Sequence, residues 1–228
     1  DPAHQVITAS LKQQKGIVTA NKLLMARHGV EYLNLAVKHS SYLGFEASVA
    51  GGIPIIRALR RSLFADQILR VRGILNGTCN FILTEMAESG REFREVLAQA
   101  QALGYAEADP SLDVSGRDTT DKLSILAGLS FGLWVPPADI PTRGISDIWP
   151  IDVLYAKKLN CRIRLLGLAE RREDRLVLRV SPFLVDSRLP LAAVSGVLNA
   201  VEVVGRRLGS TVHIGRGAGG DPTSVSVV

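Results

Sequence analysis

The chain has 228 residues, 46% of them hydrophobic and 21% charged, which predicts a soluble globular protein with a sizeable core. Its net charge of +5 comes from dispersed arginines without interleaved aromatic residues, so we expect no nucleic-acid partner. No apolar run approaches the roughly 20 residues that span a bilayer, so we expect no membrane partner. No charged-then-apolar leader opens the chain, and Cys79 and Cys161 have no neighbours at zinc-ligand spacing, which predicts reduced thiols in a cytoplasmic protein.

The N-terminal residues predict part of a parallel α/β unit. Four segments have the character of helix, strand, helix and strand in turn: residues 6–13, 17–19, 21–28 and 41–47. The second helix is expected to stop at Gly29. Because the earlier half of such a unit is missing, we expect the chain to be truncated at its N-terminus.

The middle of the chain predicts two helices and one strand. Pro54 is expected to start a helix over residues 55–63, since its missing N–H would have no partner there. Residues 67–74 alternate apolar residues with arginine, which predicts a half-exposed strand. A helix over residues 91–103 is expected to end at Gly104, directly before an acidic segment.

The second half predicts a helix followed by paired strands. The helix covers residues 118–131, and strand patterns occupy residues 161–170, 175–183, 198–204 and 210–214. The first two strands flank a hairpin turn. The expected fold class is therefore α/β: an α+β part with a mixed, mostly antiparallel sheet, joined to a partial parallel unit.

The acidic segment, residues 104–122, is the most informative stretch. Its five acids are Glu107, Asp109, Asp113, Asp118 and Asp121. Acids crowded in this way repel one another unless a cation, a metal or a ligand lies among them. A calcium loop is disfavoured, because the spacing lacks the alternating acids, central glycine and terminal glutamate of that motif.

Lys122 is the candidate proton donor. It follows Asp118 by four residues, on one helix face and at the edge of a buried stripe. Burial lowers an ammonium pKa while carboxylates raise it, so such a lysine can stay charged and still give up a proton. The alternative is an ordinary surface ion pair worth a few tenths of a kcal/mol.

At this point the residues resemble a known family, the homoserine dehydrogenases. The run AQALGYAEADPSLDVSGRDTTDK resembles the family signature at each fixed position. Four other blocks are similar to the same family: VTANK at 18–22, FEASVAGGIPII at 45–56, GILNGTCNFIL at 73–83 and GRGAGGDPT at 215–223.

The resemblance implies an NAD- or NADP-dependent oxidoreductase that interconverts L-homoserine and L-aspartate 4-semialdehyde, in threonine, methionine and isoleucine biosynthesis. Lys122 would protonate the developing alkoxide, and Lys22 would lie near substrate and cofactor. Glu107 and Asp118 would bind the substrate ammonium, with Asp113 as a supporting partner.

Asn76 and Thr78 stand at an expected helix start, where backbone N–H groups could bind a substrate carboxylate, although helix capping explains them equally well. By resemblance, the cofactor-binding residues are Ala20, Asn21, Lys22, Gly217 and Gly219. The glycines at 215, 217 and 220 spell G-x-G-x-x-G, but too few residues follow for a dinucleotide fold.

A monovalent cation, Na⁺ or K⁺, is implied by the same resemblance, through backbone carbonyls in the segment around the paired glycines. The corresponding residues are Glu46, Val49, Gly51 and Ile53. A turn that needs positive φ explains these glycines as well.

The resemblance implies three parts: residues 1–44 from a Rossmann-type nucleotide-binding domain, residues 45–200 for catalysis and dimerisation, and residues 201–228 as strands and a glycine loop returning to the nucleotide domain. We expect a homodimer, because exposed strand edges need cover. Two alternatives stay open: a non-catalytic dimerising remnant unable to bind nucleotide, and an oxidoreductase acting on another amino-acid aldehyde.

Overall fold

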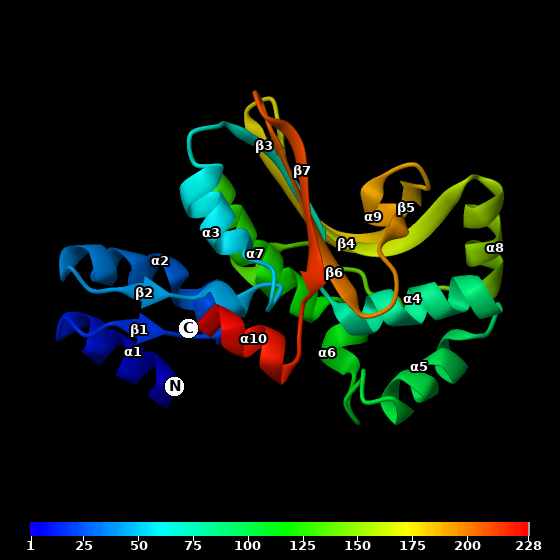
Figure 1. Cartoon of the computed structure of the whole chain (residues 1–228), viewed down its shortest axis with the longest axis horizontal. Coiled ribbons are helices and arrows are strands. Elements are labelled where there is room, and N and C mark those ends of the chain that lie inside the picture. Colours follow the sequence, from blue (N-terminus) through cyan, green and yellow to red (C-terminus); the bar gives the residue numbers. More distant parts are fainter. Residues whose placement is uncertain (228) are drawn as a thin grey trace.

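The structure is a computed structural model and describes residues 1–227. A small parallel sheet and two flanking helices form the N-terminal end of the molecule (Figure 1). Its elements are α1 (Pro2–Lys12), β1 (Ile17–Val18), α2 (Lys22–Lys38) and β2 (Leu43–Gly44). The parallel pairing of β1 with β2 confirms the predicted parallel unit, although the second strand is shorter than expected.

Helix α2 does not stop at Gly29, so that prediction was wrong. A Cβ on Gly29 would lie 2.3 Å from the Trp134 ring, and a Cβ on Gly128 would also lie 2.3 Å from it. The two glycines therefore let α2 and α7 (Arg117–Phe131) close on the same indole. This packing outweighs the roughly 1 kcal/mol that a glycine costs inside a helix.

A five-stranded sheet forms the larger part, with strand order β5-β4-β3-β6-β7 and antiparallel pairing throughout. Its strands are β3 (Ile68–Ile74), β4 (Cys161–Arg172), β5 (Arg175–Asp186), β6 (Leu198–Gly205) and β7 (Gly209–Arg216). The β4–β5 register pairs Arg172 with Arg175, which confirms the predicted hairpin turn. The mostly antiparallel α+β prediction is confirmed.

Helices pack on both faces of this sheet: the main core lies on one face, and a smaller cluster that contains Leu166 and Leu191 lies on the other. The helices are α3 (Ile55–Arg57), α4 (Gly77–Ser89), α5 (Phe93–Ala102), α6 (Ser111–Val114), α7, α8 (Pro150–Lys158) and α9 (Pro190–Ala193), with short 3-10 turns at Glu46–Ser48 and Pro137–Asp139. The expected helix over 55–63 continues from α3 as a π-helical turn, Ala58–Ser62. Helices α4 and α7 pack on the sheet (Figure 1), and buried Val71 and Leu123 belong to the core between them.

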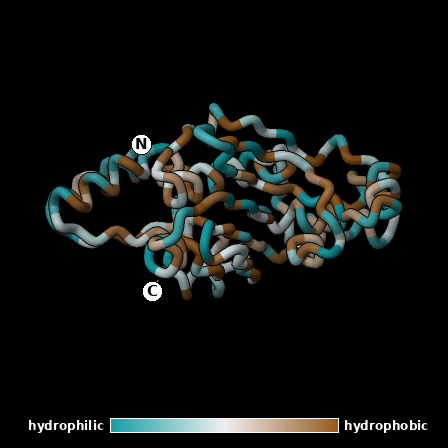
Figure 2. Tube along the Cα trace, turned by 90° about the horizontal axis from the view of Figure 1, so that it is seen from above, coloured by the Kyte–Doolittle hydropathy of each residue, from teal (hydrophilic) through white to brown (hydrophobic). Residues whose placement is uncertain are grey.

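The last helix, α10 (Gly220–Val227), was not expected from the sequence. It lies at the same end of the molecule as the N-terminus in both views (Figures 1 and 2). The Gly52 N–H donates to the Arg216 carbonyl over 3.0 Å, and the Ser226 hydroxyl donates to the Gly51 carbonyl over 2.6 Å. The C-terminal segment is thereby fastened to the segment around residue 51. Among the described helices, none is long and apolar enough to cross a bilayer.

Candidate active site

The site is centred on Asp118, in the first turn of α7, where a carboxylate is favoured by the helix dipole. Its Oδ1 lies 2.6 Å from the Lys22 Nζ, and its Oδ2 lies 2.8 Å from the Lys122 Nζ. The Asp118 side chain is only 6% exposed. A buried carboxylate thus joins two ammonium groups from two different helices.

Local sequence explains how these side chains are presented. The Asn21 side chain accepts from the Leu24 N–H over 3.1 Å, so α2 begins at Lys22 and the lysine projects from its first turn. At the other helix, Gly116 precedes α7 with a φ of 86°, a conformation that glycine adopts without strain. The two helix starts therefore bring Lys22 and Asp118 together.

Asn76 connects the two acids of the site. Its Oδ1 caps α4 by accepting from the Cys79 N–H over 2.8 Å. Its Nδ2 donates to the Asp113 Oδ1 over 2.6 Å and to the Asp118 Oδ2 over 2.8 Å. Asn76 is therefore a helix cap that also belongs to the polar cluster.

Lys122 has two fixed partners. Its Nζ donates to the Leu75 carbonyl over 2.7 Å and to the Asp118 Oδ2 over 2.8 Å. An ammonium carries three donors, and among residues 1–227 no third acceptor is bonded to this one. One N–H of a side chain that is 12% exposed therefore stays available for a ligand.

The charges of the cluster perturb one another. Burial raises the pKa of Asp118, but the nearby Lys122 and Lys22 ammonium groups outweigh it and lower this pKa to about 2. Burial lowers the pKa of Lys22, but the Asp118 charge and hydrogen bond outweigh it and hold that pKa above its usual value. At neutral pH the centre is therefore a carboxylate shared by two cations.

Two further carboxyls respond in the opposite sense. Burial raises the pKa of Asp113, against the lowering effect of its hydrogen bond from Asn76. Burial and the Asp118 charge raise the pKa of Asp121, which the sequence placed among the acids without giving it a role. Asp121 follows Asp118 by about one helical turn on α7, and this spacing in the sequence could have indicated that the two carboxylates lie close together.

Two predicted substrate residues lie outside the cluster. The Thr78 hydroxyl donates to the Tyr105 carbonyl over 2.6 Å, which fastens the start of α4 to the loop after α5. The Glu107 side chain is exposed and makes no ion pair or hydrogen bond within the described chain. Its backbone carbonyl accepts from the Gln101 Nε2 over 3.1 Å.

The predicted cofactor residues form two groups. Ala20, Asn21 and Lys22 make the turn from β1 into α2. Gly217 lies against Asn199, since a Cβ on Gly217 would come within 2.0 Å of the Asn199 amide. The Asn199 Oδ1 is buried and has no partner among residues 1–227. An unpartnered amide oxygen beside a glycine backbone suits a ligand that carries an N–H donor.

The residues of the expected cation segment already have internal partners. The Glu46 carboxylate accepts from the Ile56 and Arg57 N–H groups, each over 2.8 Å, at the start of α3. The Gly51 carbonyl accepts from Ser226 over 2.6 Å, and the Ile53 carbonyl accepts from the Ile55 N–H over 2.7 Å. These two carbonyls keep their second lone pairs for a cation.

Comparisons with known proteins agree with the motifs. The profile of the homoserine dehydrogenase family matches residues 54–228. A homoserine dehydrogenase of Pseudomonas aeruginosa is 50% identical over 226 residues, which are 99% of this chain and 52% of that protein.

Solved structures extend the likeness to the fold. A homoserine dehydrogenase from Thiobacillus denitrificans has a TM-score of 0.96 at 46% identity, and the match covers 100% of this chain and 53% of that one. A hyperthermophilic archaeal homoserine dehydrogenase in complex with NADPH has a TM-score of 0.86 at 32% identity, covering 99% and 66%. The chain spans about half the length of the curated relatives it matches.

Proposed function

This chain belongs to the homoserine dehydrogenase family, and from that premise we propose that the protein interconverts L-homoserine and L-aspartate 4-semialdehyde with NAD(H) or NADP(H). The observation that carries the proposal is the buried Asp118 carboxylate between the Lys22 and Lys122 ammonium groups. Reduction of an aldehyde leaves an alkoxide, which needs a proton donor and positive charge at the oxygen.

Lys122 is the proposed donor. Two of its N–H groups are held by the Leu75 carbonyl and Asp118, so the direction of the third is fixed by the protein. A donor whose orientation is fixed before the reaction loses little freedom in the transition state. Lys22, held on the other oxygen of Asp118, supplies a second positive charge at the same place.

The substrate ammonium is proposed to bind to Glu107 and Asp118, with Asp113 beside them. Within the described chain, the Asp118 Oδ1 contacts only the Lys22 ammonium and retains a lone pair for a further donor. Asn76 and Thr78, at the start of α4, are proposed to receive the substrate carboxylate near the backbone N–H groups of that helix.

The nicotinamide cofactor, when bound, supplies the hydride. Ala20, Asn21 and Lys22 are proposed to line its pocket from one side, and Gly217 and Gly219 from the other. The support is the unpartnered Asn199 oxygen beside Gly217 and the archaeal relative whose structure holds NADPH.

Three finer features belong to the same proposal. A Na⁺ or K⁺ ion is proposed at Glu46, Val49, Gly51 and Ile53, through backbone oxygens. A homodimer is proposed to cover the edge strand β7, since unpaired strand edges otherwise invite association. The protein is proposed to act in the cytoplasm, in threonine, methionine and isoleucine biosynthesis.

A substrate comparison tests the proposal. In a protein extended to the full length of the curated relatives, NADPH oxidation is followed with L-aspartate 4-semialdehyde and with succinate semialdehyde, which has the same aldehyde and carboxylate but no ammonium. We expect kcat/KM to fall at least about 10²-fold for the second, because a site that binds a charged group leaves its own charges unpaired when that group is missing. Equal rates would contradict ammonium recognition, and absence of turnover with both would favour the non-catalytic remnant.

A further inference from the structure

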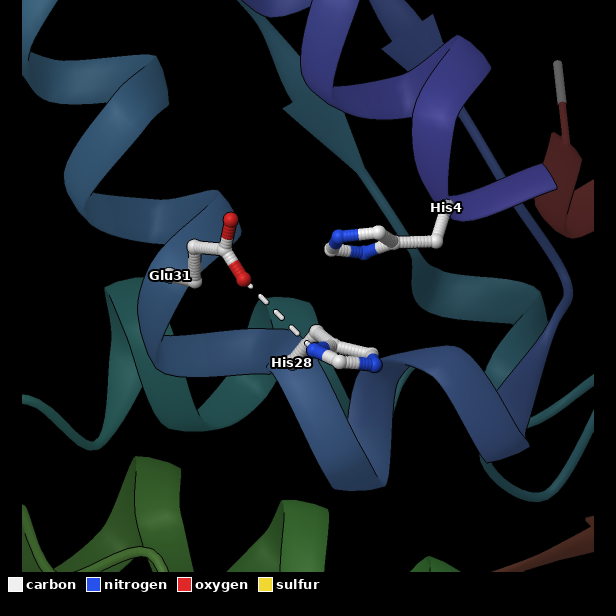
Figure 3. Close-up of side chains that lie close together, drawn as sticks. All are labelled: His4, His28 and Glu31. Carbon is white, nitrogen blue, oxygen red and sulfur yellow. Dashed lines mark ion pairs between the residues drawn. The ribbon is translucent and has the colours of Figure 1, made fainter. Parts of the chain in front are cut away.

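A cluster of potential metal ligands lies between α1 and α2, away from the lysine-carboxylate cluster. His4 on α1 and His28 and Glu31 on α2 place one ligand atom each within 4.8 Å of one another. Figure 3 shows the two imidazole rings facing each other and the Glu31 carboxylate directed at His28. We propose that His4, His28 and Glu31 bind one divalent transition-metal ion of the zinc class, which joins the two helices.

The present contacts leave these ligand atoms available. The His28 Nδ1 lies 3.5 Å from the Glu31 Oε2, longer than a well-formed hydrogen bond. The His4 and His28 ring centroids are 4.2 Å apart. A tetrahedral zinc ion with bonds of about 2.0–2.1 Å needs ligand atoms roughly 3.4 Å apart, so small side-chain rotations are enough to close the site.

Tyr32 supports the coordination of His4. Its hydroxyl lies 2.8 Å from the His4 Nδ1, and the Tyr32 side chain is fully buried. Metal binding at the His4 Nε2 requires the tautomer in which the Nδ1–H donates to this hydroxyl oxygen. Such a partner on the second ring nitrogen is the usual companion of a metal-binding histidine.

The chemistry of the ligands selects the metal. Two imidazoles and a carboxylate suit zinc, cobalt, nickel or copper, whereas calcium and magnesium prefer oxygen ligands alone. Two neutral imidazoles and one carboxylate leave a divalent ion with one net positive charge, and a water molecule completes a fourth position. His28 and Glu31 also line an open surface hollow, which gives solvent and metal a route to the site.

Such an ion would fasten the N-terminal end of α1. That helix is otherwise anchored mainly by two buried side chains, Ile7 and Leu11. The Ser41 hydroxyl adds one hydrogen bond to the Leu11 carbonyl, over 2.6 Å. A metal bond from His4 to α2 therefore reinforces the end of α1 that lacks these anchors.

The test uses metal-free protein titrated with ZnCl₂ by calorimetry and with CoCl₂ by visible absorption. We expect one ion per chain, with a tetrahedral cobalt spectrum, and a rise in Tm of about 5 °C or more at hundredfold excess over Kd. His28→Ala and Glu31→Gln are expected to weaken zinc binding at least about tenfold, and Tyr32→Phe by roughly tenfold. His39→Ala, at the end of the same helix and outside the cluster, is the matched control and should bind as the parent does.

Two results would overturn the proposal: no saturable binding of zinc or cobalt, or unchanged binding in His28→Ala and Glu31→Gln. Both variants alter partly exposed side chains, and circular dichroism verifies that they fold. The outcome is independent of dehydrogenase activity, since none of the three ligands belongs to the lysine-carboxylate cluster.

Discussion

Replacing Asp118 by asparagine removes the charge that joins Lys22 and Lys122 while keeping the size of the side chain. The folded protein lowers the pKa of Asp118 from its usual 3.8 to about 2. At about 1.4 kcal/mol per pH unit, this difference corresponds to roughly 2 kcal/mol of stability. Because the pKa is lowered on folding, that stability is present above pH 4 and is lost as the pH falls towards 2.

Asp118→Asn is therefore expected to unfold about 2 kcal/mol more easily than the parent in urea at pH 7. Asp121→Asn is the matched control on the same helix. Burial and the Asp118 charge raise the pKa of Asp121, so its ionised form opposes folding at neutral pH, and its removal should leave stability unchanged or increase it. Equal stability of Asp118→Asn and the parent, or a larger loss in Asp121→Asn, would refute the shared-carboxylate reasoning.

Two further predictions concern helix packing and cofactor binding. Gly29→Val should lower the free energy of unfolding by roughly 1–3 kcal/mol, because its Cβ would lie 2.3 Å from the Trp134 ring. Gly220→Ala is the control and should be neutral, because its Cβ would have no atom within 4 Å. Equal urea midpoints for Gly29→Val and the parent would contradict this packing. Calorimetry on residues 1–228 alone should show NADPH binding much weaker than that of the Pseudomonas aeruginosa relative. The reason is that the turn from β1 to α2 contains no glycine, whose backbone could approach a pyrophosphate. Comparable NADPH affinity of the two proteins would contradict this account of the nucleotide site.

Local sequence patterns predicted much of the fold and one ion pair of the candidate active site, Asp118 with Lys122. The hairpin of β4 and β5, the helix α7 and the pairing of Asp118 with Lys122 all follow from spacing along a single element. Such features depend on periods of two and about four residues, which the sequence displays directly.

The missed features depend on contacts between distant segments. The pairing of Lys22 with Asp118 requires α2 to dock on α7, and the Leu75 acceptor is a backbone group that no side-chain pattern reveals. Gly29 looked like a helix end because its packing partner, Trp134, is far away in the sequence. The residue roles taken from the family resemblance stay predictions. This holds above all for Glu107, whose side chain is exposed to solvent.

The most direct test of the central claim is the turnover of Lys122→Ala, assayed with L-aspartate 4-semialdehyde and NADPH in a protein extended to the full length of the curated relatives. Lys157→Ala, an exposed lysine on α8, is the control. Loss of a positioned acid should lower kcat about 10²-fold or more with a smaller change in KM, while the control keeps the parental rate. A kcat for Lys122→Ala close to that of the parent would contradict the assignment of Lys122 as the proton donor.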